Sequence, residues 1–413
     1  EDGRLPGIND ATAEGSVGHF DKAAYVFGDE AFLRRSSGRN LIWPVDEEKI
    51  DAAKEKAEGG LLPSSHADNA GIAMLRSQGV VKPEQQYQAL LSYGSHGAHH
   101  GHWNRLDLEH LRRFGKLATQ NRTAWFGYGS FLYQMFGQTS LARSMVIVDG
   151  KNQYPAPSTP LLYHSGDLFQ VMAVENETRW SFPRFGGHKG YSEKEKEQGV
   201  MQTKAGAVSI PEDAPPGGHM TGFTEPVRSR RALVVTDEYV MVLDHVSAEK
   251  KHTYDVLYQF FGFEGFDGGN DLEKIAEREK FDDDYRSAAQ FITDCTGYES
   301  TGTVMANFVS GYNRDKDGWQ ESQPHPVVKD GMDTMNIDVY TVWPQARRHI
   351  VGKNPGGRVP SADTYSAART TGQEASFVTL IELQEDKGDR QIKSVEADGP
   401  NQIRVALADG TTH

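Results

Sequence analysis

The first part of the chain has the pattern of helices. Residues 11–28 and 29–38 are spaced like an antiparallel helix pair, and each segment ends in glycine, which favours a helix C-terminus. A third helix is predicted at residues 44–60, because aspartate and glutamate occupy its first turn and two glycines end it. We therefore expect a helical segment over residues 1–60.

After residue 65 the pattern changes to short segments rich in valine, leucine, tyrosine and phenylalanine, each bounded by turn residues. Thr236–Glu238 separates two β patterns and predicts a hairpin. Helices followed by many antiparallel strands indicate an α+β fold with a large β-sandwich. We assign the sandwich to residues 61–325 and a further β-sheet region to residues 326–413. The main predicted strands lie at residues 70–77, 86–94, 142–150, 167–177, 230–246, 252–263, 303–312, 333–345, 376–385 and 401–409.

Two polar segments, residues 186–220 and 351–370, are longer than loops that only connect strands. Loops of this length are usually functional or mobile. The charged run at residues 192–198 is interpreted as a solvated turn. Three basic residues of the second segment are too scattered to predict a binding patch: Lys353, Arg358 and Arg369.

Composition limits the possible partners and surroundings of the protein. The formal net charge of −14 argues against nucleic acid, because phosphate binding needs a basic surface. An anionic substrate would equally need a locally basic cleft in this acidic protein. No apolar run approaches the length of a membrane span, and the single cysteine, Cys295, cannot form an internal disulfide. Residues 1–10 do not resemble a signal peptide, so we expect a cytosolic protein or a trimmed mature chain.

Histidines cluster in the stretch YGSHGAHHGHWNRLDL, which begins at Tyr93. Four fall close together: His96, His99, His100 and His102. His100 and His102 have the His-x-His spacing that puts two imidazoles on one side of a strand, as zinc sites use. Acid–base chemistry near neutral pH is a second interpretation, and a histidine-rich surface loop is a third. The spacing alone leaves these three interpretations open.

Four motifs follow in order from this cluster. They are HGHWNRLDLEHLRRFGKLATQNRTAWFGYGS, QTSLARSMVIVDGKNQ, RSRRALVVTDEYVMVLDHV and HTYDVLYQFFG. The series resembles the heparinase II/III-like family of polysaccharide lyases, especially its oligo-alginate-lyase-like branch. The resemblance covers about residues 1–265 and, more weakly, the strands to residue 385. The order of four motifs is more specific than any one of them.

The resemblance implies the end of an (α/α) toroid followed by antiparallel β-sheets. It also implies an enzyme that cleaves a uronate-containing polysaccharide by β-elimination, with removal of the C5 proton and expulsion of the C4 oxygen. That proton is weakly acidic, so the substrate carboxylate has to be neutralised as charge develops. The resemblance assigns catalysis to His100 and Tyr128. We expect substrate contacts from these residues: His99, His102, Asn104, Arg143 and Arg230.

The sequence departs from the family pattern at the metal ligands. The position of the family's histidine ligand is Arg143, and that of its aspartate ligand is Arg122 or Gln120, depending on the register. Asn104 replaces the usual aspartate of the first motif. A guanidinium and an amide do not make a zinc site. We therefore expect no metal cofactor, and Arg143 to supply a positive charge in its place.

Three further alternatives remain open. A different trio, His96, His99 and His102, is an alternative zinc site. Arg230 shares a strand face with Arg228, where the two arginines bind either an acidic group or carboxylates across the sheet. The function itself has two rivals: a uronyl C5-epimerase, and a non-catalytic carbohydrate-binding protein.

The resemblance places the family's principal base upstream of the DGRLPGIND segment with which this chain opens. The base would then lie in an upstream toroid segment missing from this chain, or a tyrosine within the chain, Tyr128 or Tyr93, would replace it. We expect an acidic polysaccharide or oligosaccharide as the partner, and a periplasmic or secreted protein.

Overall fold

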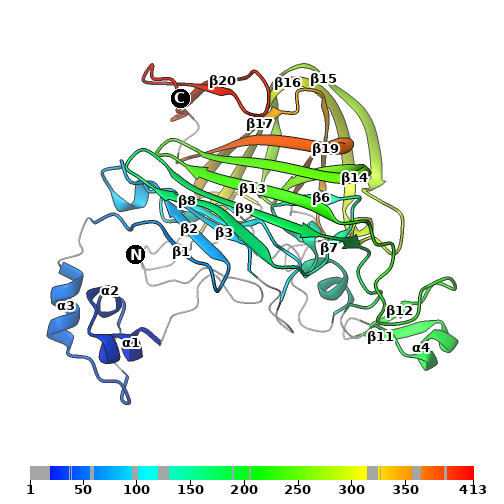
Figure 1. Cartoon of the computed structure of the whole chain (residues 1–413), viewed down its shortest axis with the longest axis horizontal. Coiled ribbons are helices and arrows are strands. Elements are labelled where there is room, and N and C mark those ends of the chain that lie inside the picture. Colours follow the sequence, from blue (N-terminus) through cyan, green and yellow to red (C-terminus); the bar gives the residue numbers. More distant parts are fainter. Residues whose placement is uncertain are drawn as a thin grey trace.

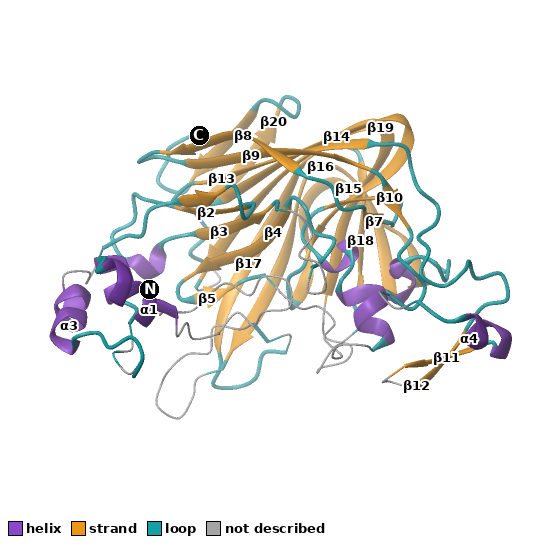
Figure 2. Ribbon diagram, turned by 60° about the horizontal axis from the view of Figure 1, so that its bottom comes forward, coloured by secondary structure: helices purple, strands orange, loops and turns teal. Residues whose placement is uncertain are grey.

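The structure is a computed structural model, and it describes residues 19–36, 38, 40–55, 60–94, 101–119, 130–187, 190–203, 206–313, 324–325, 327–355, 364–385 and 388–413. About half of the described chain is β-strand, and its few helices lie at the start and in short connections (Figures 1 and 2). The large β-rich fold is thus confirmed, whereas the toroid stays a prediction. Among these residues, no helix is long and apolar enough to cross a membrane.

Three helices occupy the predicted helical segment: α1 His19–Phe27, α2 Glu30–Leu33 and α3 Glu47–Glu55. Gly28 follows α1 with a φ of 62°, a left-handed conformation that glycine adopts without steric penalty. Ile50 and Ala53 are the buried residues of α3. The three helices lie together at one side of the sheets (Figure 2).

The largest element is an antiparallel sheet of ten strands (Figure 1). Its main path, in spatial order, is β15 Phe263–Lys280, β16 Thr293–Tyr312, β17 Asp333–Trp343, β19 Thr364–Gln384, β14 Val240–Tyr258, β13 Val227–Val235, β9 Gln170–Thr178 and β8 Ser158–Ser165. Two further strands join it: β18 Arg347–Lys353 pairs with β16 and β19, and β6 Val146–Val148 pairs with β14. β19 lies between β17 and β14, so strands from both sides of the predicted boundary at residue 325 pair within one sheet.

A second, five-stranded sheet packs on the first and forms the predicted sandwich. Its strands, in order, are β1 Ser65–Ala67, β2 Ile72–Arg76, β3 Gln88–Ser92, β4 Asp107–Arg113 and β5 Lys116–Leu117. Leu75 and Leu91 from this sheet share one buried cluster with Val174, Leu233 and Val242 from the ten-stranded sheet. The core therefore lies between the two sheets, as expected for apolar side chains that alternate along strands.

Two strands differ from the sequence pattern. β14 is one strand of 19 residues and runs through parts of two predicted segments, with a register shift between Ser247 and His252. The pattern does not predict β15, because charged residues such as Lys274 and Glu277 dominate its second half. β15 is the edge strand of the sheet, where charged side chains reach solvent without cost to the core.

The polar segment 186–220 contains regular structure: α4 Glu193–Gln198, β11 Val200–Thr203 and β12 Gly206–Ser209. The prediction of a turn at residues 192–198 was wrong. Ser192 caps the helix, since its hydroxyl accepts a bond from the Glu195 N–H at 3.3 Å, while the Glu195 carboxylate accepts the Ser192 N–H at 2.8 Å. Gly199 ends the helix with a φ of 65°.

The remaining elements are short. They are two small two-stranded sheets, β7 Asn152–Gln153 with β10 Trp180–Ser181 and β20 Ile392–Ala397 with β21 Ile403–Leu407, and the turns Pro83–Gln85, Tyr133–Gly137, Ser140–Ala142 and Ala288–Phe291. The turn at Tyr133–Gly137 is π-helical. This turn is important here because its first residue, Tyr133, lies beside His102.

Candidate active site

The described residues hold only part of the predicted site. His99, His100, Tyr128, Arg122 and Gln120 lie outside them. His102, Asn104, Arg143 and Arg230 are described, and the first three are almost fully buried.

The segment from His102 to Leu108 packs against the segment from Gly137 to Ser144. The Trp103 N–H donates to the Gln138 carbonyl at 3.1 Å, and the Ser140 hydroxyl donates to the Trp103 carbonyl at 2.5 Å. At the other end, the Leu108 N–H donates to the Ser144 carbonyl at 3.1 Å. These bonds bring His102, Asn104 and Arg143 into one neighbourhood, although they belong to two different motifs.

Asn104 and Arg105 fix the turn that follows the histidine motif. The Arg105 guanidinium donates to the His102 carbonyl at 3.2 Å and to the Asn104 side-chain oxygen at 3.1 Å. The Arg105 N–H donates to the Gln153 side chain at 2.8 Å. Burial lowers the pKa of Arg105 to about 10, against the opposing effect of the carboxylates of Glu109 and Asp107. Arg105 is therefore a buried cation beside the motif that the sequence analysis did not identify.

Asp107 joins this turn to the segment of Arg143. Its carboxylate accepts the Ser144 N–H at 2.9 Å and an Asn104 side-chain N–H at 3.4 Å. Burial raises the pKa of Asp107 to about 6, although Arg231 and these hydrogen bonds favour the charged form. The segments are thus held together by a carboxyl group that gains its proton in the mildly acidic range.

Arg231 joins the same segments to the ten-stranded sheet. Its guanidinium donates to both carboxylate oxygens of Asp244, at 2.7 and 2.9 Å, and to the Ser144 carbonyl at 2.6 Å. Arg231 and Asp244 are direct partners on β13 and β14. Although burial alone would lower it, the pKa of Arg231 is raised by Asp244. This buried, bidentate pair is a fixed part of the scaffold around the motif.

Arg230 lies on the other face of β13. Residues alternate along this strand, so Ser229 and Arg231 point into the core while Arg228 and Arg230 are exposed. Arg230 pairs with Glu175, and Arg228 bonds Glu177 at 3.1 Å. The prediction that Arg228 and Arg230 share one face of the strand is confirmed. Of the two alternatives for their partners, an acidic ligand group or carboxylates across the sheet, the structure shows the carboxylates. Arg230 is not brought together with His102.

Tyr133 is a phenol near the motif that the sequence analysis did not select. Its ring centroid lies 6.3 Å from that of His102, with the two planes at 70°. Tyr133 starts the π-helical turn, and such turns occur frequently at functional sites. A π-helical turn has a longer period than an α-helix, and the sequence pattern does not reveal it. The family resemblance assigned the tyrosine to Tyr128 instead.

Tyr93, the other tyrosine considered as a base, is unsuited to that role. Its hydroxyl donates to the Asp68 carboxylate at 2.7 Å. Burial and this hydrogen bond raise the pKa of the phenol well above its usual range. A base needs the opposite shift.

The residues described here do not fit the zinc site of the family. The part of the chain that the structure describes contains no group of three or more His, Cys, Asp and Glu side chains able to hold a metal ion. Asp107, the carboxylate near Arg143, accepts hydrogen bonds from Ser144 and Asn104. Two of the neighbouring side chains, Arg105 and Arg143, are cations without a lone pair to offer.

Solved structures with this fold include proteins named as lyases. A heparinase III gene product with methylated lysines matches with 14% identity and a TM-score of 0.50, over 100% of this chain and 49% of that chain. A heparan sulfate lyase HepC mutant from Pedobacter heparinus and a heparinase III each match with 11% identity and a TM-score of 0.50, over 100% of this chain and 50% of theirs.

The chain thus spans about half the length of these proteins, and the likeness shows a common fold. No protein-family model matches the sequence, and no curated protein matches it.

Proposed function

We propose that this protein is a polysaccharide lyase that cleaves a uronate-containing acidic polysaccharide by β-elimination. The observation that carries the proposal is the packing of the segment from His102 to Leu108 against the segment from Gly137 to Ser144, which contains Arg143. His102 and Asn104 come from one motif and Arg143 from another; all three are buried, and hydrogen bonds such as those of Ser140 with Trp103 and of Ser144 with Asp107 hold their two segments together. The common fold with structures named heparinase III and heparan sulfate lyase supports the same reaction class.

The proposed reaction needs a base, an acid and positive charge. The base removes the C5 proton, the electron pair of that bond forms the C4–C5 double bond, and the C4–O bond breaks. The leaving oxygen then takes a proton. We assign proton transfer to His100 and Tyr128 from their motif positions, with Tyr133 as a further phenol beside His102.

Arg143 and Arg105 are the cations proposed to offset the substrate carboxylate. Both are 3% exposed, so little water screens them. A fixed cation in such surroundings stabilises the enolate-like charge that develops at C5 more strongly than one at the surface would. The two arginines would thereby stabilise the charge that develops at C5, a role that the family assigns to other groups. No step of the proposed reaction requires a metal.

The test is an activity panel with purified protein. Alginate, ulvan, glucuronan and glycosaminoglycans are incubated separately, and absorbance in the ultraviolet is followed. A rise in absorbance shows the unsaturated uronate that only a lyase produces. If no rise occurs, solvent deuterium entering C5 without chain cleavage would identify an epimerase. Binding without either reaction would identify a carbohydrate-binding protein and would overturn the proposal.

A further inference from the structure

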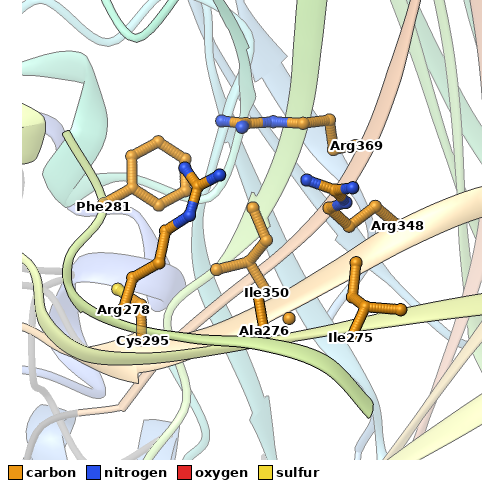
Figure 3. A pocket seen from close by; sticks show the side chains of 9 residues that line it. Ile275, Ala276, Arg278, Phe281, Cys295, Arg348, Ile350 and Arg369 are labelled. Carbon is orange, nitrogen blue, oxygen red and sulfur yellow. The ribbon is translucent and has the colours of Figure 1, made fainter. Parts of the chain in front are cut away.

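A pocket opens at the far part of the ten-stranded sheet, between β15, β16, β18 and β19. It is small and open to solvent. Three arginines line it, Arg278, Arg348 and Arg369, together with apolar side chains that include Phe281 and Ile350. Figure 3 shows the three arginine side chains gathered around one space, beside Phe281 and Ile350.

Strand pairing explains why the arginines meet. Arg348 on β18 is directly opposite Arg369 on β19, and like charges at opposed positions normally destabilise a sheet. Each of these two arginines has a carboxylate on its other side. Arg369 donates to both oxygens of Asp255, at 2.7 and 2.9 Å, and Arg348 donates to Glu299 at 3.1 Å.

Arg278 adds a third positive charge without a carboxylate of its own. It lies on β15 opposite Cys295, and among the described residues its guanidinium forms no ion pair. Three arginines and two bound carboxylates leave one positive charge at this pocket, in a protein whose formal net charge is −14. A local excess of this sign attracts an anion to this place on an otherwise acidic protein.

The pocket is also preorganised. The Arg369 guanidinium lies 4.6 Å from the centroid of the Phe281 ring, and the Asp255 carboxylate that holds it is almost fully buried. Guanidinium groups bind the planar carboxylate and the sulfate group in matching geometry. Phe281 and Ile350 are each 8% exposed and give the pocket an apolar lining beside the arginines.

We propose that this pocket binds an acidic substituent, carboxylate or sulfate, of a sugar residue. Resting on the proposed function, the site would hold an acidic polysaccharide away from the linkage being cleaved. Strand β14 connects the two places. Asp255 on this strand holds Arg369. Gln259, the residue after the end of β14, lies roughly 13 Å further along the extended chain, and its N–H donates to the Ser144 hydroxyl at 3.1 Å.

The test compares Arg278→Ala with Arg404→Ala. Both replace an exposed arginine, but Arg404 lies on β21, outside the pocket, where it pairs with Glu396. Binding of an unsulfated uronate tetrasaccharide and of a sulfated glycosaminoglycan tetrasaccharide is measured by titration calorimetry at low salt. We expect Arg278→Ala to weaken binding of at least one ligand about tenfold, the scale of a lost charge-assisted hydrogen bond, and Arg404→Ala to leave it unchanged.

The two ligands separate the possible substituents. An effect confined to the sulfated ligand assigns the pocket to sulfate, and an effect on the unsulfated one assigns it to the uronate carboxylate. Equal binding by the wild type and Arg278→Ala, or no binding of either ligand to the wild type, would overturn the proposal. Binding that depends on Arg278 in a protein that produces no unsaturated uronate would keep the pocket and remove the lyase.

Discussion

Two arginines of the ten-stranded sheet, Arg231 and Arg278, differ in how their charge is compensated. Arg231 is buried, and its guanidinium bonds both oxygens of Asp244 and a carbonyl. Arg278 is exposed at the pocket, and no ion pair involving it occurs in the described chain. A buried cation needs a partner because desolvation is expensive, whereas an exposed one keeps its hydration shell. Arg231, whose donors are taken up by Asp244 and Ser144, therefore maintains the scaffold, and Arg278 remains available to a ligand.

The strongest test of this difference is the removal of Arg231. Arg231→Met leaves Asp244 buried without its cation, so we expect the free energy of unfolding to fall by about 3–5 kcal/mol. The adjacent Arg230 provides the matched control, since its pair with Glu175 is on the exposed face. Arg230→Met should cost less than about 1 kcal/mol. Urea unfolding measures both, and similar losses for the two variants would contradict the comparison.

The next largest effect concerns His100, to which the family resemblance assigns catalysis. We expect His100→Ala to lower turnover by roughly 10²-fold or more while the fold is retained, which is the usual scale for losing an acid–base group. His164→Ala is the control, because His164 is exposed on the edge strand β8. The rate of unsaturated uronate formation is measured for both variants. Full activity of His100→Ala would show that this histidine takes no part in the mechanism.

A third test asks whether Arg143 takes the place of a metal. Arg143→Ala should destabilise the protein by about 2 kcal/mol, because a buried charge with hydrogen bonds is lost from the cluster. We also expect elemental analysis of the wild type to find no stoichiometric zinc after dialysis against a chelator. Near-stoichiometric zinc that resists the chelator, and whose forced removal lowers the melting temperature, would refute the replacement and favour a histidine trio.

The last effect is a pH dependence from Asp107, which is the smallest when it is expressed per unit of pH. Its pKa is raised to about 6 in the folded protein from 3.8, so between these values the folded state binds more protons than the unfolded state. Stability from this group is therefore present below about pH 4 and is lost as the pH rises to about 6. Asp107→Asn should remove a slope of about 1 kcal/mol per pH unit. The free energy of unfolding is measured at several pH values. If the Asp107 carboxylate were stabilising, this free energy would rise with pH between about 4 and 6, which would contradict the prediction.

Alternation in the sequence was informative about faces but not about which face is buried. It correctly put Arg228 and Arg230 on one side of a strand, yet Arg231, the neighbour on the other side, is the arginine that reaches the buried cluster. A period of two residues identifies a pair of faces, and only the position of the second sheet decides which of them becomes core.

The residues that come together from distant parts of the chain were harder to predict from the sequence. Arg369 looks isolated in a polar segment, and only the pairing of β18 with β19 sets it opposite Arg348. Arg278 occupies a charged segment without a strand pattern. Local patterns predict a hairpin such as the one at Thr236–Glu238, but not which strands from distant parts of the chain will be neighbours in a sheet. The histidine motif was therefore visible in the sequence and the arginine pocket was not.

The central place of β19 has a consequence for biosynthesis. This strand, at Thr364–Gln384, fills the position between β14 and β17, so Asp244 pairs with Phe377 across a sequence separation of more than a hundred residues. While the ribosome is still making residues before β19, β14 has one exposed edge along much of its length. The sheet can close only after β19 has emerged, more than a hundred residues behind β14, and such non-local pairing folds slowly. Until then the nascent chain presents an unpaired strand edge, which makes it a candidate for chaperone binding during synthesis.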